Sequence, residues 1–258
     1  MRSRLVFIAV AIAVLVPLSV FATPVSGELD FNGSVTATLT SLNFLCIFPG
    51  GGPCNSATEG DFIINPISTG TFGGLTAPSY GHILDMNNTS TPPGATVALA
   101  NYLTFNDLSG VSLTLTQLNL GTGGACPPAM GSTCTPTDPA LISASNPLGK
   151  TGTIFEDTAQ GAVAEFSVGA DAMVTSASGQ TTPYIGVFSG TFTGMTTADV
   201  LTALSGGGMV TVPYAAKFTP STAVSTVPEP ADFLLLGTGL LGVGLLAFRR
   251  RALCELGR

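Results

Sequence analysis

The stretch Val111-Ser112-Leu113-Thr114-Leu115-Thr116-Gln117-Leu118 alternates apolar and polar side chains over its whole length. Because successive side chains of a β-strand point to opposite faces, this alternation predicts a strand with one buried face. Similar alternation, or a short apolar run, recurs along the chain between clusters of turn-forming glycine, proline, asparagine and aspartate. The further strands predicted in this way are 35–40, 62–64, 97–105, 152–155, 163–168, 172–176, 185–192 and 209–218.

The composition favours strands over helices. Only 9% of residues are charged, against about 25% in a typical soluble domain. Exposed faces of helices need long charged side chains, which this chain lacks. One short helix is expected at 197–204, with Thr196 or Thr197 as its cap. The sequence therefore predicts an all-β, antiparallel, β-sandwich-like domain, a sandwich or a barrel-like sandwich, with one short helix.

The N-terminal segment has the pattern of a secretion signal. Arg2 and Arg4 precede an unbroken apolar run at residues 5–16, which Pro17 ends. A charged start followed by an apolar run of this length is typical of a signal peptide. Cleavage is expected after Ala22, because small or modest side chains lie just before that bond. An uncleaved membrane helix is the alternative, although the run is short for a span of about 20 residues.

The C-terminal segment has three parts in a fixed order. Pro228-Glu229-Pro230 comes first, residues 233–248 carry no charge, and Arg249-Arg250-Arg251 follows. As a helix the uncharged part would be about 24 Å long, which is short for a bilayer core of about 30 Å, although arginines can snorkel. The three arginines place that end in the cytoplasm. The N-terminal signal independently places the region between the two segments outside.

This order of motif, apolar helix and basic cluster resembles the PEP-CTERM sorting signal. The resemblance covers about 30 residues, from Val227 to the end of the chain. It implies export from a Gram-negative bacterium that makes exopolysaccharide, and recognition by exosortase, a membrane-embedded protease. Carried over to this chain, Pro228, Glu229 and Pro230 would be the recognition element and Arg249, Arg250 and Arg251 the stop-transfer signal. A plain membrane anchor that is never processed is the alternative.

These segments define the expected organisation of the chain. The parts are a signal peptide at 1–22, an exported β-rich domain at 23–219, a linker at 220–227, a sorting signal at 228–252 with a transmembrane helix at 233–248, and a short cytoplasmic tail at 253–258. The exported region is expected to form one domain, with two halves divided near residue 110 as the alternative. The protein is expected to be anchored in the inner membrane during sorting and then to reach the cell surface or the extracellular space.

Four of the five cysteines lie in the predicted exported region. Cys46 and Cys54 have the same spacing as Cys126 and Cys134, with seven residues between them in each pair. An even number of cysteines in an exported region favours disulfides, and the repeated spacing favours two local loops, 46–54 and 126–134. No metal is expected, because zinc sites use tighter spacing and usually histidine, and His82 is the only histidine.

The sequence offers little for catalysis. His82 follows Tyr80-Gly81 in a turn-like stretch, and no G-x-S-x-G nucleophile elbow is present. Carboxylates for glycoside hydrolysis could come from Glu28, Glu59, Glu156 or Glu165 with an aspartate, but the chain has no tryptophan. Oxygen ligands for calcium could come from the pairs Glu59/Asp61, Asn106/Asp107 and Glu156/Asp157. No enzyme and no cofactor are therefore expected.

The charge of the exported region excludes one class of partner. Between Pro24 and Val227 there are twelve acidic residues and only two basic ones, Lys150 and Lys217. Contacts to phosphate need clustered lysine and arginine, so nucleic acid is not expected as a partner. The expected partners are an exosortase-like protease and the membrane during sorting, with extracellular polysaccharide as a further candidate. A structural surface or biofilm-matrix protein is the first hypothesis, and a carbohydrate- or calcium-binding adhesion module is the alternative.

Overall fold

The computed structural model describes residues 24–38, 40–47, 54, 58–75, 78–87, 89–137, 151–158 and 163–221. Strands predominate in this part of the chain, which also contains one short α-helix, α2 (Thr197–Ser205), and a 3-10 turn, η1 (Gly70–Phe72). The strands are β1 (Leu29–Ala37), β2 (Ser41–Phe44), β3 (Glu59–Ile64), β4 (Ser79–Leu84), β5 (Met86–Asn87), β6 (Thr96–Phe105), β7 (Ser112–Leu118), β8 (Thr133–Cys134), β9 (Thr153–Asp157), β10 (Val163–Thr175), β11 (Thr181–Thr193) and β12 (Val210–Pro220). The predicted all-β class with one short helix is confirmed.

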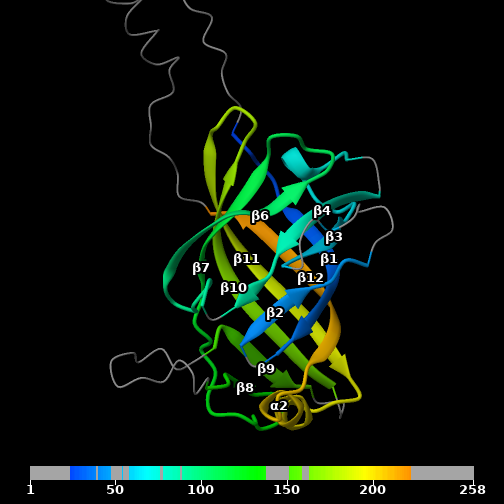
Figure 1. Cartoon of the computed structure of the whole chain (residues 1–258), viewed down its shortest axis with the longest axis vertical. Coiled ribbons are helices and arrows are strands. Elements are labelled where there is room, and N and C mark those ends of the chain that lie inside the picture. The colour runs from blue at the N-terminus through cyan, green and yellow to red at the C-terminus, as the bar shows by residue number, and fades with distance from the viewer. Residues whose placement is uncertain are drawn as a thin grey trace, which may run out of the picture. The chain divides into compact units, whose positions relative to one another are not determined.

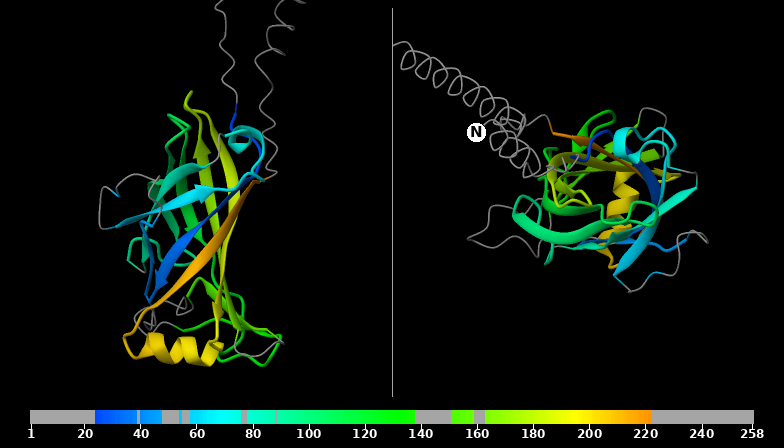
Figure 2. Two further views of the ribbon diagram at one scale, coloured as in Figure 1. Left: turned by 90° about the vertical axis from the view of Figure 1, so that its right-hand side faces the viewer. Right: turned by 90° about the horizontal axis from the view of Figure 1, so that it is seen from above.

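The strands form a single sheet that closes on itself (Figures 1 and 2). Eight strands follow one another in the order β11-β12-β1-β3-β4-β6-β7-β10, and β10 pairs with β11 to complete the ring. Each of these pairings is antiparallel. Of the sandwich and the barrel-like sandwich expected from the sequence, the structure supports the barrel-like form: one closed sheet takes the place of two separate sheets.

Long strands explain why the sheet closes. Strands β10 and β11 pair over 13 residues, from Val163 opposite Thr193 to Thr175 opposite Thr181. Strands of this length accumulate enough twist to bring the two edges of a sheet together. Closure also pairs backbone groups that would remain open at the edges of a sandwich. The alternation of side chains is the same in both architectures, so it could not distinguish them.

Two strands of the ring exchange partners along their length. The first half of β1 pairs with β3, at Phe31 opposite Ile64, and its second half pairs with β2, at Val35 opposite Phe44. Strand β10 pairs in the same manner with β9 at its start and with β7 at its end. The wall of the barrel is therefore built by different strands at its two ends, with β2, β5, β8 and β9 at the end near α2.

Helix α2 lies at one end of the barrel (Figure 2). The Thr196 side chain accepts a hydrogen bond from the backbone N–H of Asp199, and the Asp199 carboxylate accepts one from the backbone N–H of Thr196. This reciprocal capping box satisfies two backbone donors at the start of the helix. Val200 and Leu204 are buried against the core. The predicted helix and its predicted cap are both confirmed.

The interior of the barrel is packed with aromatic rings, and Phe31 lies among them. Its ring centroid is 4.5 Å from that of Phe62 and 6.1 Å from that of Phe218. Several inward glycines stand directly opposite inward aromatic residues on neighbouring strands. These pairs are Gly33 with Tyr214, Gly81 with Phe62, Gly186 with Phe218 and Gly190 with Phe166. Each ring occupies the space that a side chain on its partner would need, so large and small residues alternate around the wall.

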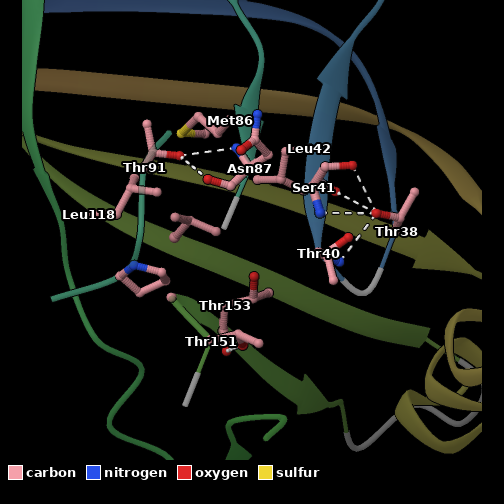
Figure 3. A pocket seen from close by; sticks show the side chains of 13 residues that line it. Thr38, Thr40, Ser41, Leu42, Met86, Asn87, Thr91, Leu118, Thr151 and Thr153 are labelled. Carbon is pink, nitrogen blue, oxygen red and sulfur yellow. Dashed lines mark hydrogen bonds between the residues drawn. The ribbon is translucent and has the colours of Figure 1, made fainter. Parts of the chain in front are cut away.

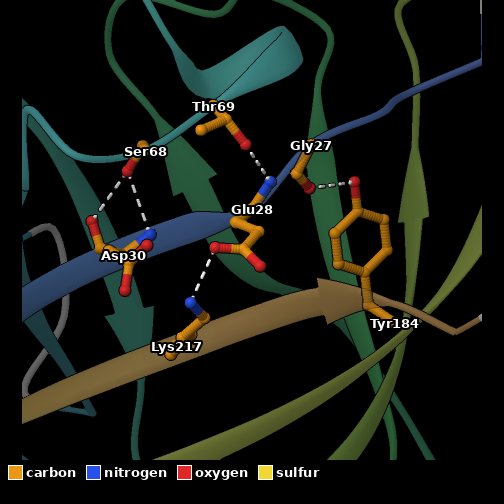
Figure 4. Close-up of polar contacts among 7 residues, drawn as sticks. All are labelled: Gly27, Glu28, Asp30, Ser68, Thr69, Tyr184 and Lys217. Atoms are coloured by element: carbon orange, nitrogen blue, oxygen red, sulfur yellow. Dashed lines mark hydrogen bonds and ion pairs between the residues drawn. The ribbon is translucent and has the colours of Figure 1, made fainter.

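The described chain begins and ends at the same end of the barrel. Leu29 at the start of β1 lies opposite Phe218 near the end of β12. Polar contacts hold this end together (Figure 4): Lys217 Nζ lies 2.6 Å from Glu28 Oε2, and the Tyr184 hydroxyl donates to the Gly27 carbonyl oxygen over 3.0 Å. Because α2 precedes the other end of β12, both ends of the described chain lie at the end of the barrel away from α2.

Buried tyrosines make the barrel sensitive to alkali. Burial raises the pKa of Tyr184 to about 12 and raises the pKa of Tyr102 and Tyr214 well above the usual value. An unfolded tyrosine ionises near pH 10, so above that pH the unfolded state releases protons that the folded state retains. The free energy of unfolding should therefore be unaffected by these groups below pH 10 and should fall as the pH rises toward 12.

We expect one cooperative unfolding transition in that interval, measured by circular dichroism together with phenolate absorbance. Tyr184→Phe serves as the control, because it removes one of the three groups and should make the fall in the unfolding free energy shallower. Phenolate absorbance from all tyrosines appearing near pH 10 while the circular dichroism stays unchanged would contradict the prediction.

The strand predictions differ from the structure in several places. Strand β1 begins at Leu29, six residues before the predicted start at Val35. The strands predicted at 163–168 and 172–176 are one strand, β10, which runs from Val163 to Thr175. His82, predicted in a turn-like stretch, lies in strand β4. Pairings between β6 and β7 and between β1 and β12 cross the boundary near residue 110 that would separate two halves.

Candidate functional site

A cleft lies between β2 and β5 on one side and β9 and the end of β7 on the other (Figure 3). Its cavity has a volume of about 50 Å³, which is room for a few water molecules. Hydroxyl groups around it are already engaged: Thr38 Oγ1 lies 2.8 Å from Ser41 Oγ, and Thr91 Oγ1 donates to the Asn87 carbonyl oxygen over 2.9 Å. Pockets for small molecules measure roughly 300–1,000 Å³, so this cleft suits bound water.

A wider hollow of about 360 Å³ lies on the outer face of β10, β11 and β12. Ile185 and Val187 line it and are 52% and 49% exposed. Asp171 and Lys217 also line it, and Lys217 is paired with Glu28. This face therefore presents apolar side chains with few charges around them, a character suited to contact with another large molecule.

The aspartates of the described chain serve mainly as hydrogen-bond acceptors for backbone N–H groups. Asp61 Oδ1 accepts from Ile47 over 2.9 Å, and Asp157 Oδ1 accepts from Thr197 over 2.6 Å. Asp85 Oδ1 accepts from Phe44 over 2.7 Å. Burial raises the pKa of Asp85, and this hydrogen bond opposes the rise. For Asp199, hydrogen bonds from the backbone and side chain of Thr196 lower the pKa.

The residues considered as calcium ligands lie mostly on strands. Glu59 and Asp61 are in β3, and Glu156 and Asp157 are in β9. Neighbours along a strand point to opposite faces, so Glu156 and Asp157 do not share one. Asn106 and Asp107 follow the end of β6. The register of β9 and β10 places Glu156 directly opposite Glu165, an arrangement that alternation within each strand could not reveal.

Both local disulfides are present. Cys46 is joined to Cys54 with 6.2 Å between their Cα atoms, and Cys126 is joined to Cys134 with 5.0 Å. These are the pairs that the repeated spacing predicts. Cys46 follows the end of β2 and Cys134 ends β8, so each bridge ties a loop to a strand end. Cys254 lies outside the described residues.

The first disulfide lies beside the only histidine of the chain. A sulfur of Cys54, a carboxylate oxygen of Glu59 and a ring nitrogen of His82 all lie within 4.8 Å of one another. His82 is directly opposite Asp61 in the pairing of β4 with β3. Sequence reasoning missed this cluster, because it placed His82 in a turn and could not see that β4 pairs with β3.

The residues predicted to act in export and sorting lie outside the described residues. These are Ala22, Pro228, Glu229, Pro230, Arg249, Arg250 and Arg251. In the part of the chain that the structure describes, none of the helices has the length and apolar character that crossing a bilayer requires. The predicted transmembrane helix at 233–248 also lies outside that part.

Comparison with known proteins identifies the C-terminal segment. Residues 226–251 match the model of the PEP-CTERM protein-sorting motif. Curated proteins give no match to the chain, and neither do solved structures. The resemblance seen in the sequence is therefore confirmed for this segment. The motif marks a protein for export, for membrane anchoring during sorting and for processing by exosortase, a membrane protein.

Proposed function

Because the chain carries a PEP-CTERM sorting motif, we propose that it is a structural, non-catalytic protein of the cell surface or extracellular matrix. Its source would be a Gram-negative bacterium that makes exopolysaccharide. The observation that carries this proposal is the match at residues 226–251. Exosortase would recognise Pro228, Glu229 and Pro230, and Arg249, Arg250 and Arg251 would hold the tail in the cytoplasm until cleavage.

The barrel supports a structural role. Its interior is filled by aromatic rings such as Phe31, Phe62 and Phe218, and the buried Asp61 accepts a backbone hydrogen bond. Closure of the sheet protects the strand edges, and two disulfides secure its loops. A domain of this kind is suited to persist outside the cell, where chaperones and ATP are absent.

The outer surface supports contact with other matrix components. Ile185 and Val187 are half-exposed on a face with few charges. This face would be the one offered to extracellular polysaccharide or to other proteins.

A calcium-binding adhesion module is the second candidate. It is favoured by Glu156 and Glu165, which face each other directly across β9 and β10. Like charges in such positions destabilise a sheet, and a bound cation would offset their repulsion. A rise in melting temperature with calcium that is absent in Glu165→Gln would favour this candidate over a purely structural role.

The structural role is tested on the matrix itself. A strain that lacks the protein should form a matrix with a lower elastic modulus, measured by rheometry, and the wild-type protein should restore it. A strain complemented with the Pro228→Ala, Glu229→Ala protein should keep the low elastic modulus, because this protein would not reach the matrix. An unchanged modulus in the deletion strain would contradict the structural role, and binding of the purified protein on a glycan array would favour a carbohydrate-binding module.

A further inference from the structure

The cluster around the first disulfide contains every ligand type that zinc prefers. Cys54, Glu59 and His82 place a sulfur, an oxygen and a nitrogen atom within 4.8 Å of one another. Cys46 is bonded to Cys54, so a second sulfur lies at the same place. The sulfur of Cys46 is also 3.7 Å from the carbonyl oxygen of Glu59. It therefore lies beside the first residue of β3.

The histidine of this cluster has an unused ring nitrogen. His82 Nδ1 is buried and makes no hydrogen bond within the described residues. Buried polar atoms are normally paired, so an unpaired one calls for an explanation. A neutral imidazole nitrogen is among the commonest metal ligands, and a disulfide sulfur is a poor partner for it. Thiolates within reach of the His82 imidazole and the Glu59 carboxylate would complete a metal site.

We propose that reduction of the Cys46–Cys54 disulfide turns this cluster into a zinc site. The thiolates of Cys46 and Cys54, the carboxylate of Glu59 and the imidazole of His82 would be the four ligands. A dithiol reductant supplies two electrons and two protons to the disulfide and closes to a disulfide itself. Binding of Zn²⁺ then displaces the two thiol protons.

Two adjustments would bring the four groups to tetrahedral positions. Zn–S bonds of about 2.3 Å and Zn–N bonds of about 2.0 Å place tetrahedral ligand atoms roughly 3.3–3.8 Å apart. For Cys54, Glu59 and His82, the observed limit of 4.8 Å requires a closure of about 1–1.5 Å. The sulfurs of Cys46 and Cys54, which are bonded in the oxidised protein, must separate to about 3.8 Å after reduction. Sulfur and nitrogen ligands select zinc over calcium and magnesium, which prefer oxygen alone. The disulfide would therefore act as a redox switch for metal binding.

The second disulfide provides a matched control. Among the described residues, Cys54, Glu59 and His82 are the one group of three or more potential metal ligands this close together, and neither Cys126 nor Cys134 belongs to such a group. Both bridges close loops of the same length in sequence. Reduction of the second bridge should therefore expose two thiols without completing a site.

The experiment uses the full-length chain in mild detergent, with Cys126, Cys134 and Cys254 replaced by serine. After reduction with a phosphine under nitrogen, titration with Co²⁺ should give a thiolate-to-cobalt charge-transfer band that saturates at one equivalent and disappears when Zn²⁺ is added. The oxidised protein should give no band. The control chain, which retains Cys126 and Cys134 but has serine at the other three positions, should also give none after reduction.

His82→Gln and Glu59→Gln should each weaken Co²⁺ binding by about 100-fold or more, since even partners outside the first coordination sphere contribute roughly 10- to 100-fold. Circular dichroism would verify that these variants fold. A second readout needs no variant, because His82 is the only histidine and its imidazole NMR signals are unambiguous. Zn²⁺ should shift those signals in the reduced chain. Absence of the charge-transfer band, or signals of His82 that Zn²⁺ leaves unchanged, would overturn the proposal.

Discussion

The Gly186→Ala variant should lose about 3 kcal/mol of unfolding free energy, at the upper end of the cost of overpacking a core. Gly186 in β11 lies directly opposite Phe218 in β12, and a Cβ atom at this position would overlap the Phe218 ring. The ring is completely buried and lies 5.6 Å from Phe188 and 6.1 Å from Phe31, measured between centroids. It therefore cannot move aside without displacing its neighbours.

Denaturation by urea, followed by circular dichroism, measures this loss. Gly124→Ala is the matched control, because the nearest atom to its added Cβ would be 4.0 Å away, and it should change the unfolding free energy by less than about 0.5 kcal/mol. Phe218→Leu makes room beside residue 186, so the double variant should be more stable than the sum of the two single losses predicts, by about 1 kcal/mol. Equal losses in Gly186→Ala and Gly124→Ala would contradict the packing described for the wall.

Local features of the structure could be predicted from the sequence. The alternation at 111–118 predicted β7, which is observed at Ser112–Leu118, because one buried face imposes a period of two. The helix at 197–204 was predicted from its cap and its apolar spacing, and α2 ends one residue later, at Ser205. The repeated cysteine spacing predicted both disulfides. Each of these signals lies within a few residues of the element that it predicts.

Closure of the sheet could not be predicted, because it depends on which strands pair. In β11, Tyr184, Gly186, Phe188, Gly190 and Phe192 occupy every second position, which is a signal that these glycines face the same side as the aromatic rings. The sequence does not say that Phe218 and Phe166 lie opposite them. That information resides in the registers with β12 and β10, which bring together residues far apart in the chain.

The cluster around His82 was missed for a related reason. The inward positions of β4 are Ser79, Gly81 and Ile83, and only the last of them is a strongly apolar residue. Because the alternation of apolar and polar residues is so weak in this strand, its sequence resembles that of a turn. Once β4 is paired with β3, His82 comes to lie opposite Asp61 and close to Cys54. The C-terminal sorting motif was recognised from sequence alone, because the order of its parts along the chain is its signature.

The sorting motif is expected to control the fate of the whole protein. Two prolines hold the backbone extended and remove its N–H donors, so the segment cannot join a helix behind it. A protease at the membrane surface needs such an accessible strip. Replacing Pro228 and Glu229 with alanine should therefore block processing almost completely while leaving the barrel folded. Thr222→Ala with Ser225→Ala is the matched control, because both residues precede the matched segment at 226–251.

The decisive measurement is the size and location of the protein in the native host. Immunoblotting of membrane, surface and medium fractions gives both. The wild type and the control should be found outside as a form shorter than that of the double variant, by roughly the residues that follow the Pro-Glu-Pro motif. Pro228→Ala with Glu229→Ala should accumulate in the membrane fraction with its C-terminal segment intact. A double variant with the same size and the same distribution as the wild type would contradict sorting through this motif.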